Sequence, residues 1–364
     1  MPRVSATASG KWARTASSRR AKRRPVTALL SCALGVRQPK LDADMRAFFR
    51  DARPWAFILF REACVSREQV RALCADLRET AGHDALVWID QEGGRVARLK
   101  APEWPVWPAC ARYGDVFARN NVEGMEAAYL GHRLIAHELR AIGVDADFAP
   151  VLDVPVDGSD KIVGDRAFSA DPKLVAVLAR AALEGLHDGG VAGCIKHMPG
   201  HGRATADSHL ALPRVAASEL DLTVDVFPFA QNADAEAAMT AHIIYEAWDP
   251  DRPATCSPIV IEDVIRTRIG FAGLLMSDDL DMKALQFALN GGLAERADAA
   301  LKAGCDVVLQ CSGDLKDMQA VAKGCATLSG LPLVRARAVE GFGKRPPREF
   351  DAEAAWARFQ QLVG

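Results

Sequence analysis

The chain has 364 residues, of which 49% are hydrophobic and 25% are charged, and its formal net charge is −2 at pH 7. This composition is typical of a globular protein with a large core, and the near-neutral charge gives no reason to expect nucleic acid as a partner. Because no run of 18 apolar residues occurs, we also expect no membrane-spanning segment.

Residues 1–25 differ from the rest of the chain because they contain eight Lys and Arg and no acidic residue. We interpret them as a disordered tail, or as the product of a start codon assigned too far upstream. Arg19-Arg20 would suit a twin-arginine secretion signal and Cys32 a lipoprotein cleavage site. The apolar core at 26–30 is shorter than the roughly 7–15 residues that such signals use. A tail that contacts nucleic acid is a further, weaker alternative.

The nine cysteines are scattered, and no two are separated by only two residues. An odd number in such an arrangement favours reduced thiols over a disulfide framework or a zinc site. We therefore expect a cytoplasmic protein with no metal and no cofactor.

Short apolar runs alternate with stretches of 3.6-residue periodicity, which is typical of βα units around a parallel sheet. Eight such runs predict an α/β fold, a single-domain TIM (β/α)₈ barrel over 26–364. The alternative, a doubly wound open sheet, would carry a glycine-rich fingerprint after its first strand, and none is present. The predicted strands are 28–34, 56–60, 85–89, 146–149, 191–195, 237–241, 274–276 and 307–309, and the predicted helices are 66–80, 122–142, 172–189, 257–269, 293–303 and 315–328.

Ionisable residues stand at the ends of four predicted strands. They are Asp90, the pair Lys196-His197, His242 and Asp278. The carboxyl ends of barrel strands meet at one mouth, where barrel enzymes place their active sites. We therefore predict one shared pocket, although a single Asp after a strand is often only a turn residue.

The segment after the third strand joins Asp90 to Arg98 through the turn Gly93-Gly94. A carboxylate can accept hydrogen bonds from two sugar hydroxyls, and a guanidinium can add a charged fork to the same site. A purely structural ion pair is the alternative for these two residues. Arg166, in a later loop, has no such context, and from the residues alone it is interpreted as solvated.

The predicted strand 191–195 leads into a loop rich in His. Pro199 stops the strand and Gly200 allows a sharp turn, so the loop can return His209 to the mouth. Asp207 lies two residues before His209, and an Asp that accepts a hydrogen bond from a His fixes its tautomer and raises its basicity. Such a His is suited to proton transfer near pH 7.

A metal site formed by His197, His201 and His209 is the alternative for this loop. The spacings of four and eight residues do not match the helical HExxH arrangement, and no Glu follows in the position of a water-activating base. We therefore predict no metal site here.

Two adjacent acids, Asp278 and Asp279, follow the seventh predicted strand. Because side chains alternate along a strand, only one can face the barrel axis, and we assign that direction to Asp278. Its carboxylate would serve as a nucleophile, a metal ligand or a helix cap, and Asp279 suits the cap better.

The order and spacing of these motifs resemble those of the bacterial β-N-acetylglucosaminidases of glycoside hydrolase family 3, the cytoplasmic β-hexosaminidases of peptidoglycan recycling. The resemblance extends from about Ala56 to Gln310. The residues that carry it are Asp90-Gln91-Glu92-Gly93-Gly94-Arg95, Lys196-His197-x-Pro199-Gly200-His201-Gly202, Asp207-Ser208-His209 and Ser277-Asp278-Asp279-Leu280.

The resemblance implies a retaining exo-β-N-acetylglucosaminidase acting on GlcNAc–anhydro-MurNAc, with or without peptide. In this reading Asp278 is the nucleophile, His209 is the acid/base and Asp207 is its partner. We expect a monomer. The residues implied to hold the N-acetylglucosamine ring are Asp90, Arg98, Arg166, Lys196 and His197, so the resemblance gives Arg166 a role that its own context did not.

Two positions depart from the family pattern, Met198 in place of Phe and Thr240 in place of Pro. We interpret both as changes in packing or in the pocket wall, with Thr240 near the acetamide. Two alternative functions use the same residues. One is a phosphorylase that passes the sugar to phosphate, and the other is a sugar-binding barrel without catalysis.

Overall fold

The structure, a computed structural model, describes residues 28–208 and 210–364. The predicted basic tail 1–25 and the predicted acid/base His209 lie outside the described residues. The interpretations of the tail and of the His209 side chain therefore stay predictions.

Eight parallel strands form the central sheet, which follows the order of the chain around a barrel. The ring is completed by hydrogen bonds between the segments of β6 and β7. Asp147 N donates to Ala192 O at 2.9 Å, and Val151 pairs with Lys196 in a parallel bridge. The predicted (β/α)₈ fold is confirmed. The strands are β1 (Leu30–Val36), β2 (Pro54–Leu59), β3 (Leu86–Ile89), β6 (Ala146–Asp147), β7 (Ile195–Met198), β9 (Ala237–Thr240), β11 (Leu274–Asp279) and β12 (Val307–Gln310).

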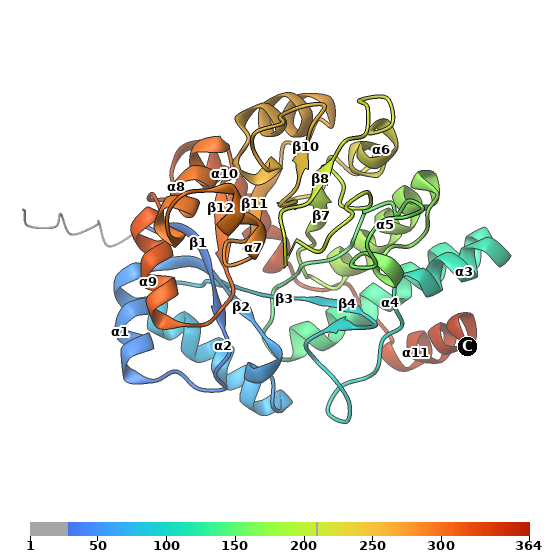
Figure 1. Cartoon of the computed structure of the whole chain (residues 1–364). Coiled ribbons are helices and arrows are strands. Elements are labelled where there is room, and N and C mark those ends of the chain that lie inside the picture. Colours follow the sequence, from blue (N-terminus) through green and yellow to red (C-terminus); the bar gives the residue numbers. More distant parts are fainter. Residues whose placement is uncertain (1–27, 209) are drawn as a thin grey trace, which may run out of the picture.

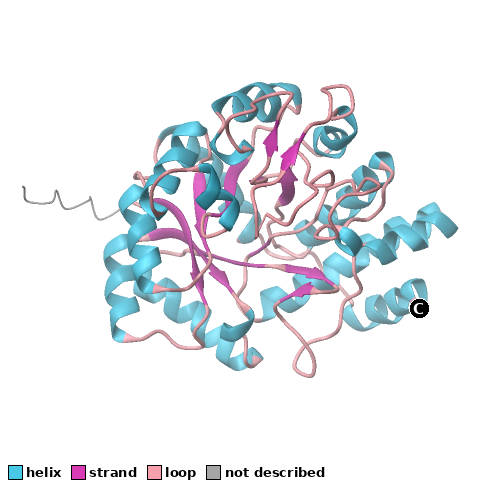
Figure 2. Cartoon of the chain, in the orientation of Figure 1, coloured by secondary structure: helices cyan, strands magenta, loops and turns pink. Residues whose placement is uncertain are grey.

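Helices surround the sheet, and Figures 1 and 2 show them on the outside of the strands. Because each helix returns the chain to the start of the next strand, all eight strands end at the same mouth. The helices are α1 (Ala43–Ala52), α2 (Arg67–Ala81), α3 (Ala111–Arg119), α4 (Asn121–Ala141), α5 (Pro172–Asp188), α6 (Thr223–Gln231), η4 (Val260–Arg268), α7 (Lys283–Ala288), α8 (Leu293–Ala303), α9 (Leu315–Gly324), α10 (Gly330–Gly343) and α11 (Ala352–Val363).

Short strands and turns lie in the loops that connect the barrel elements. Two small sheets lie outside the barrel, and one of them brings the loop after β7 back to the segment after β9. The remaining elements are the strands β4 (Gln91–Gly93), β5 (Val96–Ala97), β8 (Arg214–Val215) and β10 (Ile244–Tyr245), and the turns η1 (Arg61–Ala63), η2 (Gly164–Arg166) and η3 (Ala254–Cys256).

The structure corrects several predicted boundaries. The fifth predicted strand, 191–195, is shifted, since β7 includes Lys196 and His197 and pairs with β9 as far as Met198. Likewise, β11 continues through Asp279. Helix α1 is one of the helices that the sequence analysis missed. Asp42 was a recognisable N-cap residue, and in the structure its side chain accepts a hydrogen bond from Met45 N.

The barrel interior is filled by large side chains. Trp88 stacks on Phe148 with ring centroids 4.7 Å apart, and Trp55 lies 6.2 Å from Trp88. Ala336 and Val339 of α10 belong to the same buried cluster. Helix α10 lies at the amino ends of the strands, where Trp55 Nε1 donates to Glu340 and Arg335 donates to Asp306.

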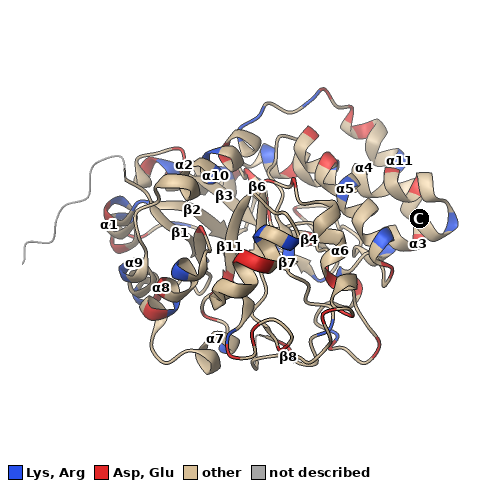
Figure 3. Ribbon diagram, turned by 90° about the horizontal axis from the view of Figure 1, so that it is seen from above, with Lys and Arg blue, Asp and Glu red and all other residues tan. Residues whose placement is uncertain are grey.

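Acidic and basic side chains are interspersed along outer helices such as α1, α8 and α9, as Figure 3 shows. None of the helices formed by residues 28–208 and 210–364 combines the length and the apolar character needed to cross a bilayer.

Candidate active site

A cavity of about 510 Å³ opens at the carboxyl ends of the barrel strands. Its floor includes apolar side chains of the barrel interior, among them Phe148 and Met239. Polar and charged side chains form its walls, including every predicted sugar-binding residue and the predicted nucleophile: Asp90, Arg98, Arg166, Lys196, His197 and Asp278.

Asp90, at the end of β3, accepts two charged hydrogen bonds. Lys196 Nζ donates to one oxygen at 3.0 Å and Arg98 Nη2 to the other at 2.8 Å. Burial raises the pKa of the Asp90 carboxyl, but Lys196 and Arg98 lower it by more, so the pKa lies well below its usual range. Asp90 is therefore a permanent carboxylate that can accept hydrogen bonds from sugar hydroxyls.

Glu92 joins Lys196 to Arg166 behind the cavity wall. It accepts both Nε and Nη2 of Arg166 at 2.8 Å and lies 2.6 Å from Lys196 Nζ. Burial raises the pKa of the Glu92 carboxyl, but Arg166 and Lys196 lower it by more, to about 2. The bidentate contact fixes the plane of the Arg166 guanidinium. From its local sequence Arg166 was interpreted as solvated, whereas in the structure it forms part of the cavity wall.

His197 is oriented by Asp153, a fully buried carboxylate. His197 Nδ1 donates to Asp153 Oδ2 at 2.7 Å, and the backbone N–H groups of His197 and His201 donate to the other oxygen. The Nε2 atom of His197 then faces the cavity beside Arg166 Nη2, 3.5 Å away. With Nδ1 holding the proton, Nε2 can accept a hydrogen bond from a substrate hydroxyl.

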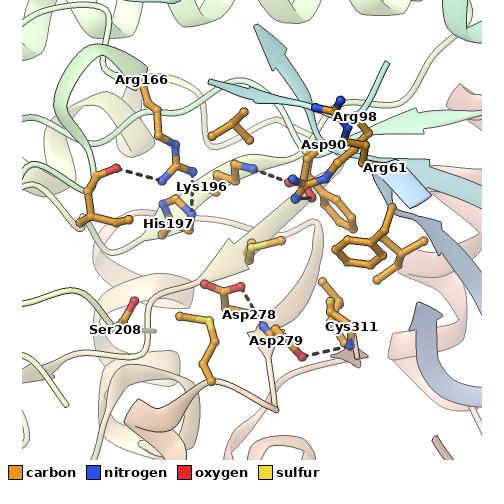
Figure 4. Close-up of a pocket in the computed structure, with 18 of the residues that line it drawn as sticks. Arg61, Asp90, Arg98, Arg166, Lys196, His197, Ser208, Asp278, Asp279 and Cys311 are labelled. Carbon is orange, nitrogen blue, oxygen red and sulfur yellow. Dashed lines mark hydrogen bonds and ion pairs between the residues drawn. The ribbon is translucent and has the colours of Figure 1, made fainter. Parts of the chain in front are cut away.

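Asp278 lies at the end of β11, and its carboxylate points towards the charged wall. Figure 4 shows it below Lys196 and His197. Its Oδ1 accepts the backbone N–H of Asp279 at 2.7 Å, which stabilises a negative charge there. The predicted direction of the Asp278 side chain agrees with this geometry, but the expectation that only one of the two acids reaches the mouth is wrong, because Asp279 also lines the cavity.

Asp279 does not have the predicted role of a helix cap. Residue Met282 occupies the N-cap position of α7, with no side-chain cap. Asp279 Oδ1 instead accepts the backbone N–H groups of Asp281 and Cys311, each at 3.1 Å. Burial, with a contribution from Asp281, raises the pKa of the Asp279 carboxyl to about 8, so it is mostly protonated at pH 7. The carboxyl therefore ties the end of β11 to the end of β12.

The loop after β7 folds back over the cavity. Ser208, a buried residue that lines the cavity, lies 3.2 Å from His201 Nε2 through its hydroxyl, and its carbonyl accepts Ala284 N of α7. The chain turns at Asp207, whose carbonyl accepts the N–H groups of Leu210 and Ala211. The residue that precedes His209 is thus at the cavity, whereas the pairing of Asp207 with His209 stays a prediction.

Two residues that the sequence placed in or near the pocket lie outside the cavity lining. His242 is fully buried and bridges Thr255 Oγ1, 2.7 Å away, and the carbonyl of Asp279, 2.9 Å away. Thr240 is likewise buried, 2.8 Å from Thr255 through their hydroxyls. The expectation that the end of the sixth strand joins the pocket is wrong for His242, because its imidazole connects the strands behind the wall.

Two acids of the site were not assigned a role from the sequence. Glu92 follows Asp90 by two residues, and this spacing on an extended chain places both side chains on one side. Asp153 follows the apolar run after β6. The i, i+2 spacing from Asp90 could have identified Glu92 from the sequence. Asp153 could not be identified in this way, because its partner His197 lies 44 residues away and is brought close only by the fold.

Among residues 28–208 and 210–364, no group of three or more His, Cys, Asp and Glu side chains is arranged to hold a metal ion. His197 and His201, two members of the alternative metal site, use Nδ1 and Nε2 respectively for contacts with Asp153 and Ser208. Burial and the neighbouring His197 lower the pKa of His201 to about 4, so His201 is neutral at pH 7.

Replacing Glu92 with Gln should lower kcat/KM by about 10-fold or more, because removing one partner of a buried ion pair leaves the other charges uncompensated and misaligned. Steady-state kinetics will measure this loss, mainly as a higher KM. The matched control is Glu246→Gln, which breaks the exposed pair with Arg214 and should change little. Similar effects of both variants would contradict the role of Glu92.

The chain is similar in sequence to a family of glycoside hydrolases. The family model described as the glycosyl hydrolase family 3 N terminal domain matches residues 37–336. A β-hexosaminidase of Thioalkalivibrio sulfidiphilus is 40% identical over 269 residues, which cover 73% of this chain and 76% of that protein. A β-hexosaminidase of Photobacterium profundum is 38% identical over 314 residues, 85% of this chain and 88% of that protein.

Solved structures give the same relationship. NagZ of Neisseria gonorrhoeae in complex with N-trifluoroacetyl-D-glucosamine has a TM-score of 0.79 and 30% identity, covering 93% of this chain and 98% of its own. A family 3 β-N-acetylglucosaminidase of Paenibacillus sp. str. FPU-7 has a TM-score of 0.81 and 28% identity, covering 91% of this chain and 66% of its own. The chain therefore belongs to glycosyl hydrolase family 3, as a glycoside hydrolase of the β-hexosaminidase type.

Proposed function

We propose that this chain is a retaining exo-β-N-acetylglucosaminidase that removes terminal GlcNAc from muropeptides, GlcNAc–anhydro-MurNAc with or without peptide, during peptidoglycan recycling. The observation that carries the proposal is the position of Asp278. Its carboxylate lies at the end of a barrel strand, across the cavity from the charged and polar side chains of Asp90, Lys196 and His197. The likeness to NagZ of Neisseria gonorrhoeae, solved with an N-acylated glucosamine, supports the sugar assignment.

Catalysis would begin when Asp278 attacks C1 of the sugar. A bond forms between its oxygen and C1 while the glycosidic C–O bond breaks, and the leaving oxygen takes a proton from His209. In the second half, His209 takes a proton from water, which attacks C1 and releases Asp278. The position of Ser208 at the cavity supports this role for its neighbour, and Asp207 would hold the imidazole.

The charged wall would bind the sugar ring. Asp90, His197 Nε2 and the cations Arg98, Arg166 and Lys196 together offer acceptors and donors that match ring hydroxyls and the acetamide carbonyl. Buried partners hold these groups before substrate arrives, which lowers the entropic cost of binding. We propose that the enzyme acts as a monomer in the cytoplasm, where its many thiols stay reduced.

The proposal is tested by comparing an aryl β-N-acetylglucosaminide with the matching aryl β-glucoside. We expect turnover of the first and a kcat/KM at least about 100-fold lower for the second, because the second lacks the acetamide. Equal turnover of the two substrates would contradict the proposed preference for N-acetylglucosamine. Assays with added phosphate should yield free GlcNAc, since the comparisons support hydrolases and give no support to the phosphorylase alternative. Activity should also survive a chelator.

A further inference from the structure

The loop that follows β7 begins with a turn pressed against α6. Tyr245 Oη donates to the carbonyl of Gly200 at 2.7 Å. A Cβ added to Gly200, whose φ is 133°, would lie 2.8 Å from Cβ of Asp225 on α6. The first residues of the loop therefore lie directly on the helix, with no space for a side chain between them.

Arg203 extends this contact with charge. Its Nε donates to Asp225 Oδ2 at 2.6 Å, and its Nη2 donates to the carbonyl of Asp221 at 2.9 Å. The Asp225 side chain is 1% exposed and that of Arg203 is 20% exposed. The guanidinium thus ties the loop to both the first turn of α6 and the segment just before it.

Arg203 is close along the chain to residues that line the cavity. Asp160 N donates to the carbonyl of the next residue, Ala204, at 2.8 Å. Three residues later the chain reaches Asp207 and then Ser208, which lines the cavity. A shift of the loop at Arg203 would therefore move the residues that approach the substrate.

A buried ion pair of this kind adds little net stability, because its charged groups lose their hydration. Burial raises the pKa of the Asp225 carboxyl to about 6, although Arg203 lowers it, and Asp153 adds a further rise. A folded-state pKa above the unfolded value favours the protonated form, so this carboxyl stabilises the fold below about pH 4 and loses that contribution as the pH rises through about 6. Its Oδ1 is also buried and has no hydrogen-bond partner among the described residues.

We propose that the Arg203–Asp225 ion pair is a positioning element for proton donation, which holds the loop so that Asp207 and Ser208 stand at the cavity. This inference rests on the proposed function, because it assigns the pair to the step in which the leaving oxygen is protonated. The pair touches no reacting atom and acts only through the loop.

The experiment compares kcat/KM for two substrates that differ in their need for an acid. An activated aryl β-N-acetylglucosaminide has a leaving group that departs without help, and a β-linked GlcNAc disaccharide does not. Arg203→Ala should lower kcat/KM for the disaccharide by about 10-fold and for the aryl glycoside by less than about 2-fold, because small displacements of a catalytic group are costly. Arg203→Lys, which keeps the charge, should restore part of the loss.

Asp225→Asn provides a second variant that separates function from stability. It should reproduce the selective loss on the disaccharide while the melting temperature at pH 7 changes little, because the amide is neutral and the Arg203 guanidinium that loses its partner is 20% exposed and can be hydrated. The matched control is Arg268→Ala, which breaks an exposed pair with Glu219 next to α6 and should leave both rates unchanged.

A loss of equal size on both substrates, or no loss on either, would overturn the inference. The same series includes His209→Ala, which tests the proposed function itself. If His209→Ala loses more activity on the disaccharide than on the aryl glycoside and Arg203→Ala does not, His209 remains the assigned proton donor and the positioning role of Arg203 is wrong. If His209→Ala does not discriminate, the assigned donor is wrong and the positioning role fails with it.

Discussion

Replacing Asp278 with Ala should lower kcat/KM for an aryl β-N-acetylglucosaminide by at least about 1000-fold, because no other group would form the glycosyl-enzyme. The folded structure should persist. Asp278 makes a local hydrogen bond to the N–H of the next residue and lies at the wall of an open cavity, so its loss creates no internal void. Far-UV circular dichroism and the melting temperature will check the fold beside the kinetics.

The neighbouring acid supplies the control for this prediction. Asp279→Asn should retain activity within about 10-fold, because Asp279 is already mostly protonated at pH 7 and a protonated carboxyl is a poor nucleophile. The amide oxygen can still accept the N–H groups of Asp281 and Cys311. If Asp279→Asn were inactive while Asp278→Ala turned over substrate, the nucleophile would be assigned to the wrong residue.

His209→Ala should produce a loss that depends on the leaving group. For a GlcNAc disaccharide the expected fall in kcat/KM is about 100-fold or more, the usual range for losing a general acid. For an activated aryl glycoside the fall should be less than about 10-fold, because a phenolate of low basicity leaves unprotonated. The basic limb of the pH profile for the disaccharide, which reports loss of the acidic proton, should disappear in this variant.

A second histidine provides the matched control for His209. His137 lies exposed on α4, outside the residues that line the cavity, and His137→Ala should leave both substrates and the pH profile unchanged. His201 is not a competing donor at pH 7, since its pKa of about 4 leaves it without the second proton. Equal losses on both substrates in His209→Ala would exclude it as the proton donor.

The strand-end residues were predictable because barrel geometry makes one mouth from eight distant segments. Asp90, Lys196 and Asp278 each follow or end an apolar run, and parallel strands bring such positions together whatever lies between them. Arg166 was not predictable from its own neighbours. Its partner Glu92 is 74 residues away, and no local pattern encodes a contact over that distance.

The alternation of apolar runs and helical stretches was sufficient to determine the barrel and the strands that carry the site, because burial of a repeating hydrophobic pattern has few solutions. Which polar groups meet was decided only by tertiary structure. His242 was predicted to face the pocket, yet it is buried behind the wall, whereas Glu92 and Asp153 orient Arg166 and His197 from within the protein. The physical reason is that a buried charge must find its partners, and those partners come from elements that are adjacent only in the folded chain.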